Sequence, residues 1–181
     1  MRSRIWLAWL LVLAAACASV QVHVDFDPSA DFSSLRTFAW FPRTREPTGD
    51  FRVDSPLLDS RIRSAVEREL AAKGFEKVVD RDPDFFVFYH FSVEDRIDVH
   101  TVNRTYVDRW GYVVSLPETR VRQYQQGTLM IDVADAREKR LVWRGVGTGR
   151  LRSSPKPDET TRAVNSAVAE ILGRFPPGAA P

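Results

Sequence analysis

The feature that most constrains the fold is a pair of amphipathic segments, one in the first half of the chain and one near its end. Ser55 and Pro56 supply the start of the first helix, and Gly74 supplies a C-terminal cap. Pro157 opens the second helix, which we expect to stop at Gly173. Their apolar stripes are Leu58, Ile62, Ala65, Val66 and Leu70 in the first, and Ala163, Val164, Ala167, Val168, Ile171 and Leu172 in the second. Each stripe needs an apolar surface to pack against, so the chain must build a second layer.

Several segments with strand patterns can supply that layer. Residues 20–26 alternate apolar and polar side chains, and so do the residues around Ile131. Residues 85–91 are apolar on both faces, which predicts a central strand covered from two sides and continuing to about Val102. Further strands are expected at residues 35–41, 75–79 and 141–151, the last after a turn at residues 135–139. The predicted fold is an α+β two-layer sandwich, with a mostly antiparallel sheet of six or seven strands and two helices packed on one face.

Residues 103–120 are the hardest segment to assign, and their composition suggests a hairpin or an aromatic-rich loop around Gly111. If exposed, the aromatic residues of this region could bind a partner, a sugar polymer or the membrane interface, where Trp and Tyr favour a half-wet position. The alternative is that they cover the second face of the sheet, because two helices leave apolar surface on a six-stranded sheet. The candidate contact residues are Tyr106, Trp110, Tyr112 and Tyr124.

The N-terminus has the layout of an export signal. Arg2 and Arg4 precede a short apolar run at residues 5–13, and three alanines then lead into Cys17, the only cysteine. The run is too short to span a bilayer, which takes about 20 residues. We therefore expect a lipoprotein signal peptide at residues 1–16 and lipid attachment at Cys17. The alternative is an ordinary signal that leaves a soluble periplasmic protein with a free thiol, because Leu13 lies four residues before the cysteine and a lipobox has its leucine three before.

Lipid attachment explains a lone cysteine better than a free thiol in an oxidising compartment does. Residues 17–19 would then form a short tether to a single domain at residues 20–177, followed by a frayed tail at 178–181. Because an extended chain gains about 3.5 Å per residue, the domain should lie close to its membrane. By resemblance to other lipoproteins, the absence of Asp at position 18 favours the outer membrane, with the domain facing the periplasm.

Composition and charge exclude some partner classes. The apolar fraction of 44% indicates a globular domain. The formal charge of +2 includes Arg2 and Arg4, which leave with the signal, so the mature domain should be neutral. Because Lys and Arg do not cluster, we expect no nucleic-acid partner.

Few residues suggest chemistry. Asp132 and Asp135 could form a carboxylate pair, but a solvated strand face plus a turn residue is the favoured interpretation. Asp98 and His100 share a strand face and could donate two metal ligands, yet zinc sites take three or four. The sequence has no nucleophile elbow, zincin helix or phosphate-binding loop, so we expect no catalytic, metal or cofactor site.

A Gly-x-Gly motif lies within the expected strand at residues 141–151. Gly145 and Gly147 are not followed by a helix, which favours a bulge or a close contact with a neighbouring side chain over phosphate binding. Trp143, just before them, is expected to fill the core.

Short motifs in a fixed order cover nearly the whole mature chain. They are Val24-Asp25-Phe26, Asp31-Phe32, Thr37-Phe38-Ala39-Trp40, Lys73-Gly74-Phe75, Asp82-Pro83-Asp84-Phe85, Gly127-Thr128-Leu129-Met130-Ile131-Asp132-Val133, Asp135-Ala136, Leu141-Val142-Trp143-Arg144-Gly145 and Phe175-Pro176-Pro177. In this order the chain resembles the bacterial envelope lipoproteins with domain of unknown function 4136. That family has no assigned activity or catalytic residues, so the resemblance implies a location and no chemistry.

The sequence thus favours a non-catalytic, membrane-tethered envelope domain that acts by binding, with an envelope protein as the candidate partner, or by structural contact. One rival is a carrier that holds an apolar or lipid ligand between helices and sheet, favoured by the apolar residues 85–91. A more distant rival is a hydrolase that uses Asp98, His100 or Asp132.

Overall fold

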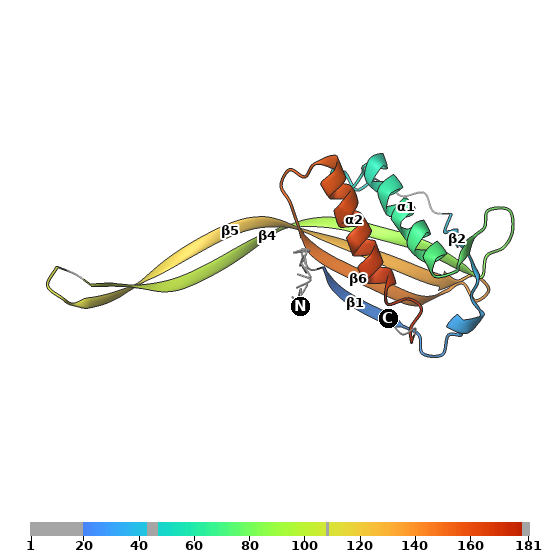
Figure 1. The fold of residues 1–181 in the computed structure, drawn as a ribbon, viewed down its shortest axis with the longest axis horizontal. Helices are drawn as coiled ribbons and strands as arrows, with labels where there is room; N and C mark the ends of the chain where they lie inside the picture. The colour runs from blue at the N-terminus through green and yellow to red at the C-terminus, as the bar shows by residue number, and fades with distance from the viewer. Residues whose placement is uncertain (1–19, 43–46, 108, 179–181) are drawn as a thin grey trace, which may run out of the picture.

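One six-stranded sheet carries two α-helices along the same side (Figure 1). The computed structural model describes residues 20–42, 47–107 and 109–178, so the predicted signal, Cys17 and residues 179–181 lie outside the described residues. The strands are β1 (Gln21–Phe26), β2 (Thr37–Trp40), β3 (Glu76–Lys77), β4 (Phe85–Val107), β5 (Val113–Asp135) and β6 (Arg140–Leu151), and the helices are α1 (Pro56–Ala72) and α2 (Pro157–Leu172).

The strand order across the sheet is β1-β6-β5-β4-β2-β3. The neighbours β1, β6, β5 and β4 pair antiparallel, whereas β2 runs parallel to both β4 and β3. The predicted α+β class and mostly antiparallel sheet are therefore confirmed, with six strands. A short 3-10 helix, η1 (Phe32–Ser34), connects β1 to β2.

Both helices begin where the sequence predicts. The Ser55 hydroxyl accepts a hydrogen bond from the backbone N–H of Leu58, and Pro56 occupies the first helical position. At the start of α2, the Glu159 carboxylate accepts from the backbone N–H of Lys156 at 2.9 Å. These contacts satisfy backbone donors that a helix leaves unpaired at its first turn.

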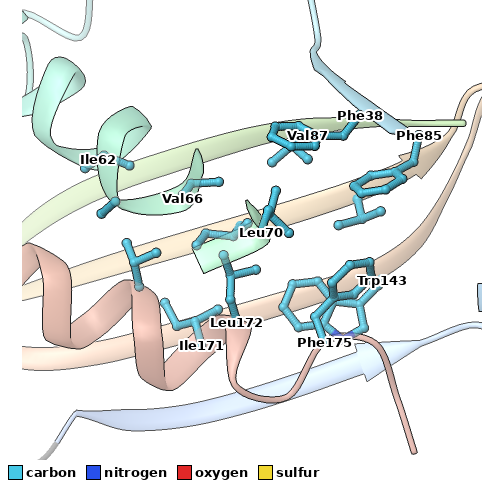
Figure 2. Close-up of a cluster of buried hydrophobic side chains, with 14 of the residues drawn as sticks. Phe38, Ile62, Val66, Leu70, Phe85, Val87, Trp143, Ile171, Leu172 and Phe175 are labelled. Atoms are coloured by element: carbon cyan, nitrogen blue, oxygen red, sulfur yellow. The ribbon is translucent and has the colours of Figure 1, made fainter. Parts of the chain in front are cut away.

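The core lies between the helices and the sheet (Figure 2). Alternate residues of the strands face the helices, and their side chains are buried together with the helical stripes. Phe175, just after α2, packs its ring 5.2 Å from that of Trp143. The fully buried large side chains include Phe38, Ile62, Val66, Leu70, Phe85, Val87, Ile131, Trp143, Ile171, Leu172 and Phe175. The prediction that Trp143 fills the core is confirmed.

The opposite side of the sheet is not covered by a helix in the described residues (Figure 1). Phe86 and Phe88 of β4 are only half-buried there, although the ring of Phe41 contacts both, with centroids 5.6 and 5.8 Å away. The expectation that residues 85–91 are covered from two sides is therefore wrong for this side. The apolar residues of β4 on this side are instead shielded from water by one another and by the Phe41 ring.

Asp84 fixes the start of β4 against β2. Its carboxylate Oδ2 accepts hydrogen bonds from the backbone N–H groups of Arg36 and Thr37 and from the Thr37 hydroxyl, at 2.9 to 3.0 Å. These hydrogen bonds, of which that from the Thr37 N–H is the largest contribution, lower the pKa of Asp84 because they stabilise its charged form. Partial burial acts in the opposite direction but is outweighed.

We expect Asp84→Ala to lower the free energy of unfolding at pH 7 by about 2 kcal/mol, because it removes hydrogen bonds to a charged acceptor. Since the folded pKa lies below the unfolded value, this stabilisation is present at neutral pH and is lost as the pH falls through the folded pKa. Urea unfolding at pH 7 and at about pH 3 measures both effects. Asp82→Ala, two residues away on the exposed turn, is the control, and an equal loss in both variants would contradict the assignment.

Candidate functional site

The most prominent feature of the molecule is a β-hairpin that projects beyond the body of the sheet (Figure 1). β4 and β5 pair without interruption from Phe85↔Asp135 to Val107↔Val113. The pairing of β6 with β5 ends at Gln125↔Leu151, and β2 pairs with β4 only at the first three residues of β4. Residues 96–124, which we call the arm, therefore form a ribbon with twelve residue pairs, roughly 37 Å long.

The hairpin that the sequence suggests for residues 103–120 is confirmed, with Gly111 at its turn in the left-handed region (φ 82°). The predicted end of the strand that begins at residue 85, at about Val102, is wrong, because β4 continues to Val107 and β5 begins at Val113. Within the ribbon, the backbone groups that face inward pair across the two strands, and the base of the ribbon is continuous with the sheet of the body.

One side of the arm, its uncharged face, contains no ionisable residue. Paired residues on this face include Val99 opposite Val121 and Thr101 opposite Thr119, whose hydroxyls lie 3.2 Å apart. This face continues the helix-covered side of the sheet, because Phe85 and Val87 have the same parity along β4. It comprises Ile97, Val99, Thr101, Asn103, Thr105, Val107, Val113, Ser115, Pro117, Thr119, Val121 and Gln123.

The other side, the charged face, holds every arginine and carboxylate of the arm's paired strands. Glu118 pairs with Arg104 at 2.5 Å and with Arg120 at 2.9 Å, each across solvent-exposed side chains. Exposed ion pairs contribute little stability, about 0–1 kcal/mol each. The face comprises Arg96, Asp98, His100, Val102, Arg104, Tyr106, Val114, Leu116, Glu118, Arg120, Arg122 and Tyr124.

Three of the four predicted contact residues gather at the tip of the arm. Tyr106, Trp110 and Tyr112 are 50%, 77% and 71% exposed. They therefore do not cover the second face of the sheet. Large exposed aromatic side chains are typical of contact surfaces, since they bring apolar area and a polar group together.

Tyr124 is not part of this tip group. It pairs with Arg96 at the base of the arm, ten residues along β5 from Val114, the partner of Tyr106, which places it roughly 33 Å away. The Arg150 guanidinium lies 3.8 Å over the Tyr124 ring and ties the base of the arm to β6. The sequence groups Tyr124 with the other three aromatic residues because they are close along the chain. In the structure, the length of the arm separates Tyr124 at the base from the other three at the tip.

The predicted acidic residues do not converge on a catalytic centre. Asp132 and Asp135 point to opposite faces of β5, because their partners Phe88 and Phe85 do so on β4. Asp135 accepts from the backbone N–H groups of Arg137 and Glu138, as a turn residue should. Asp132 is 3% exposed and receives both Nε and Nη2 of Arg144 at 2.7 Å, so the expectation that it is solvated is wrong.

Asp98 and His100 do share one face of the arm, with Nε2 of the histidine 3.1 Å from the carboxylate. No group of three or more His, Cys, Asp or Glu side chains suited to a metal ion occurs among the described residues. Arg150 also lies near Asp98, at 3.8 Å. The two residues are therefore a polar contact on the surface of the arm, with an arginine nearby.

Two surface hollows, of about 460 and 370 Å³, lie near the chain segment that follows α2. The larger is bordered by Phe32, Phe75 and Pro176, and the smaller by Val24, Phe26 and Pro177. Neither lies between the helices and the sheet, where an apolar carrier would hold its ligand; the core side chains fill that space.

The first strand enters the sheet at the end from which the arm projects. Gln21 pairs with Thr148, which pairs with Thr128, which in turn pairs with Ser92, so these four residues form one row across the sheet. Ser92 lies four residues before the arm begins on β4. An attachment point at position 17 would be four residues away, within about 14 Å of this row. Among the described residues, no helix combines the length and apolarity needed to cross a bilayer.

Together, fold and arm define an α+β domain with one sheet, two helices and a projecting β-hairpin. The chain belongs to the family described as "Domain of unknown function (DUF4136)", whose model matches residues 22–177. No protein of curated function matches the sequence.

Solved structures resemble the chain at low sequence identity. A PDZ domain protein from Parabacteroides distasonis is 14% identical over 88% of this chain, with a TM-score of 0.56. The chain spans only 36% of that protein's length. The PelC dodecamer from Paraburkholderia phytofirmans is 13% identical, covering 85% of this chain and 95% of its own, with a TM-score of 0.46.

Proposed function

We propose that the protein is a non-catalytic, lipid-tethered module of the bacterial envelope that makes its contacts through the arm. The observation that carries the proposal is the geometry of residues 96–124, a paired ribbon that projects roughly 37 Å from the folded body and ends in exposed aromatic residues. A ribbon of this kind buries little of its own surface. Its length therefore makes sense as reach towards another molecule.

The position of the first strand supports the tether. If Cys17 is lipidated, the anchor and the base of the arm lie at the same end of the body, separated by a few residues of extended chain. Several acyl chains hold a protein on a bilayer durably, at about 0.8 kcal/mol for each buried methylene. Outer-membrane attachment facing the periplasm is the location we propose, as expected from the residue after Cys17.

The test replaces Trp110 with a photo-crosslinking amino acid in the full-length chain, expressed in bacterial cells with and without Cys17→Ser. We expect the chain with Cys17 to fractionate with membranes and to give cross-linked adducts from position 110. Cys17→Ser should move the protein to the soluble periplasmic fraction, because it removes the attachment atom.

The matched control places the same probe at Phe51, an exposed aromatic residue of the body. Equal adducts from positions 51 and 110 would contradict a special role for the tip. Unchanged fractionation of Cys17→Ser would rule out lipid anchoring, and a lipid retained by the purified protein in native mass spectrometry would favour the carrier instead.

A further inference from the structure

The arm has two long strand edges with no neighbour among the described residues. β4 lacks one beyond Val87, and β5 lacks one from Tyr124 to Val113. Each edge presents backbone N–H and C=O groups directed away from the ribbon, which form a template for a further strand. A single proline, Pro117, interrupts the donors of β5, and β4 has none.

Two pairs of residues near the base of these edges are complementary to each other. Within the ribbon, Asp98 lies opposite Arg122 and Val99 opposite Val121. A second copy that laid its β5 edge along the β4 edge of the first would present the same residues in the same order. Opposite charges and matched apolar pairs on neighbouring strands favour such pairing.

The two-faced character of the arm fixes the register of such a contact. Slipping by one residue would set the uncharged face of one copy beside the charged face of the next. Alternate residues of a strand direct their backbone groups to opposite edges, so the pairs not hydrogen-bonded within one ribbon are free to bond between copies.

From these observations we infer that the arm binds a second copy of this chain, with β4 of one copy pairing antiparallel to β5 of the next. This inference deepens the proposed function, since it takes the arm as the contact element and names its partner. Attachment at one end of the body would give neighbouring copies the same orientation and a high local concentration. Because the contact uses two different edges, each added copy leaves both kinds of edge available.

A disulfide experiment tests the register in membranes. Two differently tagged full-length chains are co-expressed, one with Val99→Cys and the other with Val121→Cys, and are oxidised gently. We expect a mixed dimer, because antiparallel partners have Cα atoms about 4.5–5.5 Å apart, within disulfide reach. Val99→Cys combined with Val113→Cys is the control, since these positions would be roughly 27 Å apart along the strands. The unaltered chain shows any background from Cys17.

A second measurement removes the arm without opening the body. Residues 97–123 are replaced by Asn-Gly, which closes a tight turn between Arg96 and Tyr124, directly opposed in the ribbon. In detergent, mass photometry should show oligomers of the full chain and monomers of the shortened one. Equal sizes, or equal cross-linking of the 99/121 and 99/113 combinations, would overturn the inference. If position 110 still gave adducts with another molecule, the proposed function would survive that failure.

Discussion

Gly145→Ala is expected to lower the free energy of unfolding by about 3 kcal/mol, through overpacking of the core. A Cβ at this position would lie 2.4 Å from Cη2 of Trp143 and 2.5 Å from Cγ2 of Ile171. Both side chains are fully buried, and the Trp143 ring is held against Phe175, so neither can move away cheaply. For a domain of this size, we expect the midpoint of thermal unfolding to fall by roughly 6–12 °C.

Gly149→Ala is the matched control for that prediction. It lies on the same face of the same strand, but its Cβ would meet only Val20 Cγ2, at an ordinary 3.8 Å. We expect a change within about 0.5 kcal/mol. Equal destabilisation of the two variants would show that any side chain disturbs β6, and the packing argument would fail.

Gly147→Ala tests whether a new Cβ costs less when the atom that it meets is the movable end of a side chain. Its Cβ would lie 2.7 Å from Cδ1 of Ile171, the end of a flexible side chain. Ile171→Val removes this atom and keeps Cγ2, so it should reduce the cost of Gly147→Ala and leave that of Gly145→Ala nearly unchanged. The close contact that the Gly-x-Gly pattern predicts is thus confirmed, and its partner in α2 is identified.

The helices could be predicted because their signals are local. Capping residues and apolar spacing sit within one segment, as at Ser55 and Pro56, and no distant contact is needed to interpret them. The antiparallel strands near the core were predicted for the same reason. Their core-facing residues, such as Ile131 and Val133, alternate with residues of the other face.

The arm was harder to predict because a free ribbon has no core-facing side. Polar and apolar residues alternate only near the base, as in Arg96 and Asp98 against Ile97 and Val99; towards the tip both faces carry polar and apolar side chains. A search for charge at every second residue would have extended β4 to Arg104 and begun β5 at Glu118. It would also have separated Tyr124 from the tip.

The burial of Asp132 depends on a residue twelve positions away. Only the β5–β6 register brings Arg144 directly opposite it. Inspection of the sequence alone therefore placed a charged residue of an open face in solvent. The paired guanidinium and the neighbouring strands exclude water from that carboxylate instead.

Arg144→Ala is expected to be the second strongly destabilising substitution, with a loss of about 2–3 kcal/mol in the free energy of unfolding. Removing one partner of a buried ion pair costs about 3–5 kcal/mol, and we reduce this because the Arg144 side chain is 41% exposed and water can replace part of it. Asp25, opposite Arg144 on β1, would lose its attraction to the guanidinium as well. Chemical denaturation at neutral pH measures the loss.

Two further variants distinguish a buried charge from lost packing. Arg150→Ala removes an arginine from the same face of β6, and we expect it to cost about 1 kcal/mol, less than Arg144→Ala, because its ion pair with Asp98 and its contact with the Tyr124 ring are exposed to solvent. Asp132→Asn should destabilise the unaltered protein, because it weakens the bidentate pair. In the Arg144→Ala background the same substitution should stabilise, since it removes an uncompensated charge from a site that is 3% exposed. If Asp132→Asn destabilised both backgrounds equally, the cost of losing Arg144 would come from packing rather than from the stranded carboxylate.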